Sequence, residues 1–310
     1  MKPSRKEVAE ALTAKGEVFE LYEDKVWGRS CKVFRNTPLS LRELFASTRS
    51  DKTFITYEDE RYTFEETYQM SCRIAQIIKE KYGIKKGDRV AISMRNLPEW
   101  VFTFNAITSI GAIAVGMNAL WQSNEMKFGL DDCGACLLFS DQERINRLEP
   151  FWAEVSIDVI AIRSTKLLKG IVSLDNLLEA QPACPMHDQI INPDDRAMIL
   201  YTSGSTGKSK GAVSSHRNIL SALFSWSLQA KIRSNIEQEP VAEVRNHDNQ
   251  PAILLAVPLF HATGCLAIML QSYKAQRKMV CMYKWDTIEA VRLIEEEKIS
   301  GFNGPATMSG

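Results

Sequence analysis

The chain has 310 residues, of which 45% are hydrophobic and 25% are charged, an ordinary globular composition. Lys plus Arg and Asp plus Glu number 38 each, so the formal net charge is zero and the basic excess typical of nucleic-acid-binding proteins is absent. No apolar run reaches the roughly 18 residues that span a bilayer, and the charged N-terminal stretch lacks the apolar core of a signal peptide. We therefore expect a cytoplasmic protein, and contact with a membrane surface stays open.

Seven cysteines at scattered spacings are typical of reduced thiols and not of a disulfide framework. Cys133 and Cys136 form a C-x-x-C pair, which in other contexts is a redox dithiol or half of a zinc site. A second C-x-x-C is missing from the sequence, and the pair does not open a helix as a thioredoxin-type motif does. We interpret both as small core residues that lead into a strand at 135–141.

In chain order, β-rich runs alternate with helical patterns, which predicts an α/β fold with mixed, mostly parallel sheets and flanking helices. Strands are expected at 52–59, 61–64, 88–94, 112–118, 135–141, 156–162, 195–203, 211–215, 252–260 and 278–284, with another strand-like piece just before 301. Helices are expected at 64–82, 98–111, 124–134, 142–153, 216–231, 264–276 and 287–298. The alternation is that of a doubly wound sheet.

Capping residues mark several helix starts. Thr63 and Glu66 form a capping box, and Pro98 stands in the first turn of its helix. Ser123 is expected to cap the helix at 124–134, Ser214 or Ser215 the helix at 216–231, and Asp286 or Thr287 the helix at 287–298. The polar or proline-rich stretches 164–194 and 232–251 are expected to be irregular surface connections.

Residues 200–211, LYTSGSTGKSKG, have a composition suited to phosphate binding. A Walker P-loop, G-x-x-x-x-G-K-[ST], requires glycine at the position of Thr202, and it joins a strand to a helix. Here a second strand follows the loop, so the stretch forms a strand-loop-strand arrangement. Its glycines permit close backbone approach, consecutive N–H groups can form an anion nest, and hydroxyls and lysines can contact phosphates. The alternative is a Gly/Ser surface hairpin without a ligand.

The stretch YTSGSTGKSKG resembles the phosphate loop of the adenylate-forming (AMP-binding) superfamily, whose pattern is [ST]-S-G-[ST]-T-G-x-P-K-G. One defined position differs, because Ser209 stands where the family usually has proline, which removes a rigid φ angle. The resemblance continues in GDRVAI, N-x-x-EWV, VPLFHATG and KISGFNGPATMSG, and the N-terminal leader is similar to that of fatty-acid and aryl-acid CoA ligases. It covers essentially the whole chain and is that of an acyl-CoA synthetase.

The resemblance implies that ATP and a carboxylic acid give an acyl-adenylate and pyrophosphate, and that CoA then takes the acyl group. It implies ATP, Mg²⁺ and CoA as cofactors, assigns the binding of the ATP phosphates to the residues of the loop, and assigns a Mg²⁺ contact to Thr206. These loop residues are Thr202, Ser203, Gly204, Ser205, Thr206, Gly207, Lys208 and Lys210. His261 matches the family histidine beside the acyl pocket and is the candidate catalytic residue, and Gly264 is expected to leave room for the acyl group. Phe224 and Trp226 fit either an acyl tunnel or a helix facing the core.

The family's Y-G-x-T-E segment, its later ribose-binding aspartate and its small C-terminal domain have no counterpart in this sequence. We therefore expect a truncated large domain, with a leader at 1–50, a first α/β subdomain at 51–195 and an incomplete second subdomain at 196–310. A non-catalytic nucleotide- or partner-binding remnant of the same fold is the alternative. A hydrophobic fatty or aryl acid suits the apolar surroundings of FHATG, whereas the particular acid, the thiol acceptor and the oligomeric state stay open.

Overall fold

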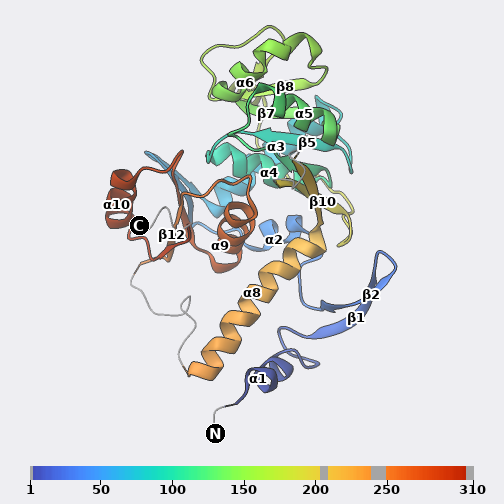
Figure 1. The fold of residues 1–310 in the computed structure, drawn as a ribbon, viewed down its shortest axis with the longest axis vertical. Coiled ribbons are helices and arrows are strands. Elements are labelled where there is room, and N and C mark those ends of the chain that lie inside the picture. Colours follow the sequence, from blue (N-terminus) through green and yellow to red (C-terminus); the bar gives the residue numbers. More distant parts are fainter. Residues whose placement is uncertain (1–2, 203–208, 239–248, 305–310) are drawn as a thin grey trace.

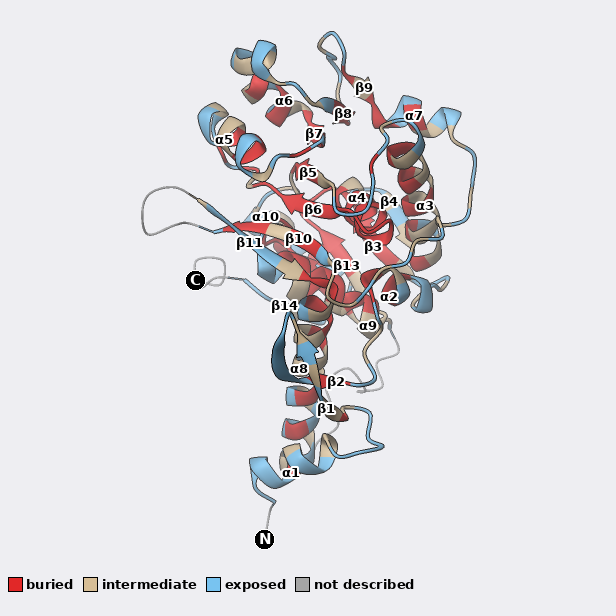
Figure 2. Ribbon diagram, turned by 90° about the vertical axis from the view of Figure 1, so that its right-hand side faces the viewer, coloured by how far each residue is buried: buried red, intermediate tan, exposed pale blue. Residues whose placement is uncertain are grey.

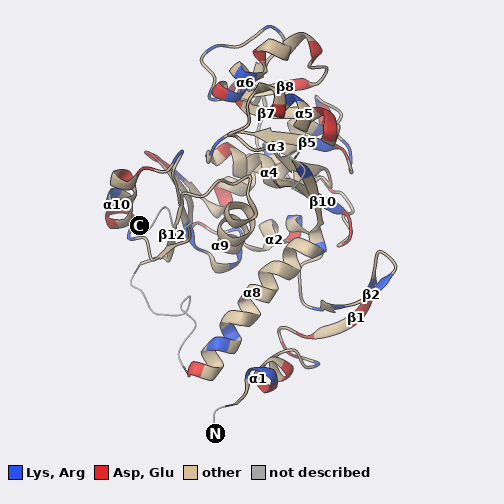
Figure 3. Ribbon diagram, viewed as in Figure 1, with Lys and Arg blue, Asp and Glu red and all other residues tan. Residues whose placement is uncertain are grey.

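The computed structural model describes residues 3–202, 209–238 and 249–304. Two large sheets with helices on their faces form the body, and the long helix α8 runs from it to the N-terminal elements (Figure 1). Buried residues concentrate on the strands and on α3 and α4 (Figure 2). Acidic and basic residues are interspersed over the described elements (Figure 3), in line with the balanced charge. Among the described residues no helix is both long and apolar enough to cross a membrane.

Seven strands form the larger sheet, with the order β11-β10-β6-β5-β7-β8-β9. All neighbours are parallel except the pair β10 and β11. The strands are β5 (Arg89–Ser93), β6 (Ile113–Gly116), β7 (Leu137–Asp141), β8 (Asp158–Ile162), β9 (Val172–Ser173), β10 (Arg196–Thr202) and β11 (Lys210–Ser215). Because the chain places β6 on one side of β5 and β7 on the other, the expected doubly wound order is confirmed.

Five strands form the second sheet, with the order β14-β12-β13-β3-β4 and one antiparallel pair, β3 with β4. The strands are β3 (Thr53–Tyr57), β4 (Glu60–Thr63), β12 (Ala252–Leu255), β13 (Lys278–Cys281) and β14 (Gly301–Phe302). Each sheet takes strands from both sides of residue 195. The predicted subdomain boundary at residue 195 therefore does not separate one sheet from the other. The boundary itself stays a prediction.

Side chains alternate between the two faces of each strand, so each sheet packs against a different layer of helices on each face. In β5, Ile92 faces a core shared with α3 (Phe64–Glu80) and α4 (Pro98–Ser109), whereas Ala91 faces α5 (Ser123–Cys133) and α6 (Gln142–Leu148). In β12, Leu255 faces that same shared core, whereas Leu254 faces α10 (Thr287–Glu296). The helices α3 and α4 therefore join the two sheets. All but one of the twelve residues of α4 are buried, as expected for a helix that is apolar on all sides.

The N-terminal elements pack on the far half of α8 (His216–Glu237). They are α1 (Arg5–Leu12) and the hairpin of β1 (Leu21–Val26) with β2 (Arg29–Phe34). Val8 and Phe34 form a small cluster with Leu228 and Ile232 of α8. The remaining helical segments are α2 (Leu41–Ser47), the 3₁₀-helix η1 (Glu149–Glu154), α7 (Leu174–Ala180), the π-helix η3 (Thr263–Leu270) and α9 (Gln271–Ala275).

Some local expectations are confirmed and others are wrong. The capping box of Thr63 and Glu66 is present, and Ser215 and Asp286 cap their helices. Gln122 and not Ser123 is the N-cap of α5, because the Gln122 backbone N–H bonds the Glu125 carboxylate. The segment 164–194 is not irregular throughout, since it holds β9 and α7.

Two further expectations are corrected by packing. Helix α8 continues to Glu237, because its second half is covered by α1 and β2, so the expected loop at 232–251 begins too early. Residues 239–248 of that segment lie outside the described residues. Cys133 ends α5 and Cys136 is exposed, so the C-x-x-C pair is not a pair of core residues. All seven cysteines are free thiols.

Candidate functional site

A cavity of about 990 Å³ opens where the carboxyl ends of strands from both sheets meet. Its strand wall consists of Met198, Leu200 and Thr202 of β10, Ala212 and Ser214 of β11, and Ser209 just before β11. Its turn wall consists of Phe260, His261, Ala262, Thr263 and Leu266, which follow β12. Its loop wall consists of Asn118, Leu120 and Trp121, which follow β6. In open α/β sheets this edge is where ligands bind.

The strand wall follows from the register of one antiparallel pair. Met198 lies opposite Ser214, Leu200 opposite Ala212, and Thr202 opposite Lys210. Residues directly opposite each other in an antiparallel pair project to the same face, so these pairs form one row toward the cavity. Lys210 continues this row at its open end, beyond the residues that line the cavity itself, and its side chain is exposed.

The expected phosphate loop is bracketed by this pair. Thr202 ends β10, Lys210 begins β11, and the Thr202 Oγ1 donates to the Lys210 carbonyl oxygen at 3.4 Å. The expected strand-loop-strand arrangement is thus confirmed at both ends. Six of the predicted ligand residues lie outside the described residues and stay predictions: Ser203, Gly204, Ser205, Thr206, Gly207 and Lys208.

Ser209 belongs to the site although its sequence signal pointed the other way. The family usually has proline at this position, whereas the Ser209 of this chain lines the cavity next to β11. Its hydroxyl offers a donor that proline lacks. Strand alternation could not have indicated this, because Lys210, Ala212 and Ser214 form the row toward the cavity and Ser209 is out of phase with them.

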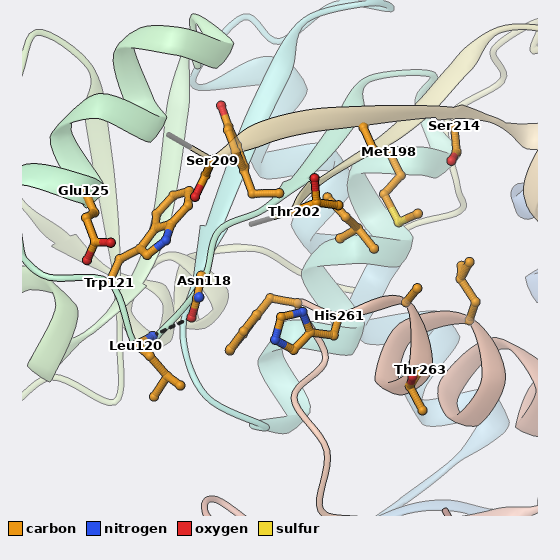
Figure 4. Close-up of a pocket in the computed structure, with 16 residues that line it drawn as sticks. Asn118, Leu120, Trp121, Glu125, Met198, Thr202, Ser209, Ser214, His261 and Thr263 are labelled. Atoms are coloured by element: carbon orange, nitrogen blue, oxygen red, sulfur yellow. Dashed lines mark hydrogen bonds between the residues drawn. The ribbon is translucent and has the colours of Figure 1, made fainter. Parts of the chain in front are cut away.

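His261 lies on the turn wall, opposite the strand side of the cavity in Figure 4. The His261 backbone N–H donates to the Pro258 carbonyl at 3.1 Å, and its ring packs against Phe260 with centroids 4.6 Å apart. The surrounding protein excludes solvent from part of the ring and thereby lowers the pKa of His261 below its ordinary value. The imidazole is therefore neutral at pH 7, with one nitrogen to donate and one to accept.

Gly264 does not leave room for an acyl group, which corrects the expectation. A Cβ at this position would lie 2.2 Å from the Pro258 carbonyl oxygen and 3.1 Å from the Leu259 Cα. The glycine thus allows the π-helix to approach the backbone of the turn before His261. Its role is in shaping the turn wall, and it does not line the cavity.

The loop wall is held from behind by two arginines of α6. Arg144 is fully buried, pairs with Asp141 at 3.0 Å, and donates from Nε to the Ala119 carbonyl at 2.8 Å. Arg147 donates to the carbonyls of Ala119 and Trp121 at 2.9 and 2.8 Å. These charge-assisted bonds fix the backbone of a loop that has no strand partner of its own.

Trp121 closes the loop wall toward the strand wall. Its ring meets Tyr201 edge-on with centroids 5.0 Å apart, and it packs so closely on α5 that a Cβ at Gly129 would lie 2.5 Å from the ring. The Tyr201 hydroxyl donates to Asp132 at 2.7 Å. At the other end of the loop, the Asn118 Oδ1 accepts from the Leu120 N–H at 2.9 Å, the dashed contact in Figure 4.

Comparison with known proteins identifies this arrangement. Residues 43–309 match the family model described as AMP-binding enzyme. The chain belongs to this family. The match covers both sheets from α2 onward, and the cavity lies entirely within it.

Two curated proteins to which the chain is similar are CoA ligases by name. The chain is 26% identical to 4-coumarate–CoA ligase 3 of Oryza sativa subsp. japonica over 78% of its length and 41% of that protein. It is 24% identical to the long-chain-fatty-acid–CoA ligase of Bacillus subtilis over 83% of its length and 48% of that protein. The chain thus spans less than half the length of these relatives.

A solved structure shares the AMP-binding fold. The o-succinylbenzoate coenzyme A synthetase MenE of Bacillus subtilis, in complex with ATP and magnesium ion, matches with a TM-score of 0.69 and 23% identity, over 88% of this chain and 65% of that one. At this identity the likeness shows the fold. It confirms the expected mixed, mostly parallel α/β architecture.

Two aromatic residues that fitted an acyl tunnel lie elsewhere in this AMP-binding chain. Phe224 packs with Phe19 and Phe34, with ring centroids 6.2 and 5.7 Å away, so it anchors the N-terminal elements to α8. Trp226 is 41% exposed, and neither residue lines the cavity. The core-facing interpretation is therefore correct for Phe224 and wrong for Trp226.

The chemistry of the cavity suits a magnesium ion brought by phosphates. The described residues contain no cluster of three His, Cys, Asp or Glu that could hold a metal ion. Thr202 and Ser209 offer hydroxyl oxygens at the cavity, and Glu125 offers a carboxylate. Mg²⁺ usually takes one or two protein oxygens and completes its shell with phosphate oxygens and water. The donor set fits this mode of binding, with Thr206 still a predicted contact.

Proposed function

We propose that this chain carries the ATP and acid sites of an AMP-forming acid–thiol ligase, which converts a carboxylic acid to an acyl-adenylate and then to a CoA thioester. The observation that carries the proposal is the cavity itself, where the strands bracketing the phosphate-loop sequence face His261 across the carboxyl ends of both sheets. The family match and the CoA ligase names of the relatives support the same reaction.

In the proposed first step, an oxygen of the substrate carboxylate bonds to the α-phosphorus of ATP. The bond from that phosphorus to the bridging oxygen of the β-phosphate breaks, and pyrophosphate leaves with the electron pair. Thr202 and Ser209 would donate hydrogen bonds to phosphate oxygens, and Lys210 would neutralise charge at the open end of the row. Magnesium, when bound, would further stabilise the leaving phosphates.

His261 would act on the acid and not on the nucleotide. A neutral imidazole on the turn wall can donate one hydrogen bond to the carboxylate without competing with Lys210 as a cation. In the second proposed step the CoA thiol loses its proton to solvent and its sulfur bonds to the acyl carbon. The bond from that carbon to the bridging oxygen breaks, and AMP leaves with the oxygen and the electron pair. A different thiol acceptor would use the same first step.

A hydrophobic acid suits the cavity best. Met198, Leu200, Ala212 and Leu266 give the strand and turn walls an apolar surface between the polar ends. The relatives named for 4-coumarate and long-chain fatty acids agree with an aryl or alkyl acid.

Pyrophosphate release tests the proposal. The chain is incubated with Mg-ATP and a panel of aryl, medium-chain and long-chain acids, and one class should stimulate release. Lys210→Ala should lower kcat/KM for ATP by about 10²-fold, the usual effect of removing one group that stabilises developing charge. Lys6→Ala, at an exposed lysine of α1, is the matched control and should leave the rate unchanged. Binding of ATP without binding of any acyl-adenylate analogue, measured by thermal shift, would favour the non-catalytic binding protein.

A further inference from the structure

Asn96 ties the two sheets together next to the cavity. It follows the end of β5 in the seven-stranded sheet and is only 3% exposed. Its Nδ2 donates to the Val257 carbonyl at 3.1 Å and makes a longer contact of 3.5 Å with the Leu255 carbonyl. Its Oδ1 accepts from the Leu259 N–H at 2.9 Å. All these backbone partners belong to the end of β12 and the turn that follows it.

The Asn96 amide group thus donates to and accepts from the same short stretch of backbone. Beyond Leu255 the chain leaves the five-stranded sheet, and buried backbone groups there still require hydrogen-bond partners. Asn96 supplies a donor and an acceptor two residues apart, as a neighbouring strand does. Aspartate could replace only the acceptor, and leucine neither.

The anchored stretch leads directly to His261. Leu259 is two residues before the histidine, and the Pro258 carbonyl between the two anchor points accepts the His261 N–H. The same Pro258 carbonyl lies against Gly264. The turn wall is therefore fixed on one side by Asn96 and on the other by the π-helix.

We propose that Asn96 is a positioning residue, which sets the place of His261 relative to the strand wall by anchoring the turn between them. Asn96 does not line the cavity, so it acts through the backbone of residues 257–259. The positioning itself is independent of the reaction, whereas its effect on turnover rests on the proposed function.

Hydrogen exchange tests the positioning without substrate. In the full chain, Asn96→Ala should speed exchange of the Leu259 amide by about tenfold, the loss of one net hydrogen bond. Asn96→Asp keeps the acceptor and should leave that amide protected. Asn105→Ala is the matched control, because Asn105 is an equally buried asparagine of α4 that bonds the Tyr273 hydroxyl and not the turn. Equal exchange at Leu259 in Asn96→Ala and Asn105→Ala would overturn the proposal.

Titration of the His261 imidazole by NMR, assigned with His261→Gln, gives a second readout. Asn96→Ala should move the His261 pKa up toward its ordinary value, because a relaxed turn admits water, while Asn105→Ala should leave it in place. For turnover, Asn96→Ala should lower kcat/KM for the acid by about 10²-fold, as misplacement of a reacting group does, with the KM for ATP little changed. If Asn96→Ala does not fold, Asn96→Ser is measured in its place against Asn105→Ser, because the shorter side chain cannot reach both the Val257 carbonyl and the Leu259 N–H. An inactive wild type with the expected exchange pattern would reject the proposed function and leave the positioning intact.

Discussion

The strand wall and the turn wall of the cavity are held in place by different interactions. The strand wall is an antiparallel pair at the edge of the seven-stranded sheet, and Lys210 to Val213 of β11 are exposed. His261 to Thr263 of the turn wall are exposed as well, but the stretch that leads to them, Ala256 to Phe260, has no strand partner and is mostly buried. It is fixed by the Asn96 amide and by the close approach of Gly264 to Pro258.

Because of this difference, we expect the strand wall to matter mainly for ligand binding and the turn wall mainly for the position of the backbone. On the strand wall, cross-strand pairing holds the backbone, so side chains can change with little effect on the fold. On the turn wall, the backbone itself is packed against neighbours, so a single added carbon displaces it. We expect mutations of the turn wall to cost stability first and mutations of the strand wall to cost ligand binding first.

The largest effect is expected from Gly264→Ala. The added Cβ would overlap the Pro258 carbonyl, and backbone atoms cannot move aside as a side chain can, so the free energy of unfolding should fall by about 3 kcal/mol. Gly211→Ala on the strand wall meets the Ile199 Cγ2 at 2.9 Å and should cost clearly less. Urea unfolding measures both. Equal losses would remove the distinction between the walls.

The second effect is a loss of stability in acid, which we expect from the buried His216 at the end of β11. His216 follows β11, is fully buried, and accepts the Leu41 N–H through Nδ1 at 3.1 Å. Burial lowers the pKa of His216 to about 4 from 6.5. The folded state thus disfavours the proton, so this stability is fully present above pH 6.5 and is lost as the pH falls to about 4.

The change from this one histidine should reach about 3 kcal/mol. Urea unfolding between pH 7 and 4 should show a steeper pH dependence for the wild type than for His216→Asn, which keeps an acceptor near the Leu41 N–H but does not titrate. His187→Asn, at a half-buried histidine, controls for the loss of a histidine elsewhere. Parallel pH profiles of wild type and His216→Asn would show that another group dominates.

A smaller effect is expected from Tyr201→Phe. This change removes the hydroxyl that donates to Asp132 at 2.7 Å and to the Gly129 carbonyl at 3.2 Å, and it should cost about 1 kcal/mol. Tyr82→Phe is the control, because Tyr82 is half-buried and does not line the cavity. Thermal unfolding distinguishes the two, and a larger loss for Tyr82→Phe would contradict the role assigned to Tyr201.

The smallest effect on stability is expected from Thr202→Val. Its hydroxyl makes only a 3.4 Å contact with the Lys210 carbonyl at an exposed position, so the free energy of unfolding should change by about 0.5 kcal/mol or less. Binding of Mg-ATP, followed by calorimetry, should nevertheless weaken. A stability loss with unchanged nucleotide affinity would make Thr202 a structural residue.

Much of the fold could be predicted because it depends on local patterns. The alternation of strands and helices, the capping box at Thr63 and the strand-loop-strand around 203–208 all follow from periodicity, capping chemistry and glycine spacing. The errors have a common cause. The second half of α8, the helix α7 and the exposure of Cys136 depend on which distant segment covers them. Adjacent residues carry little information about that cover.

The site divides in the same way. The sequence by itself determined the family-like phosphate loop, the histidine in FHATG and the neutral overall charge, since short motifs carry their chemistry in residue types and spacing. Only the tertiary structure decided that Ser209 lines the cavity, that Gly264 serves the backbone and not the acid, and that Asn96 reaches from one sheet to the turn of the other. Asn96 and Leu259 are 163 residues apart in sequence, and a contact of this kind exists only once two sheets have packed around a common layer of helices.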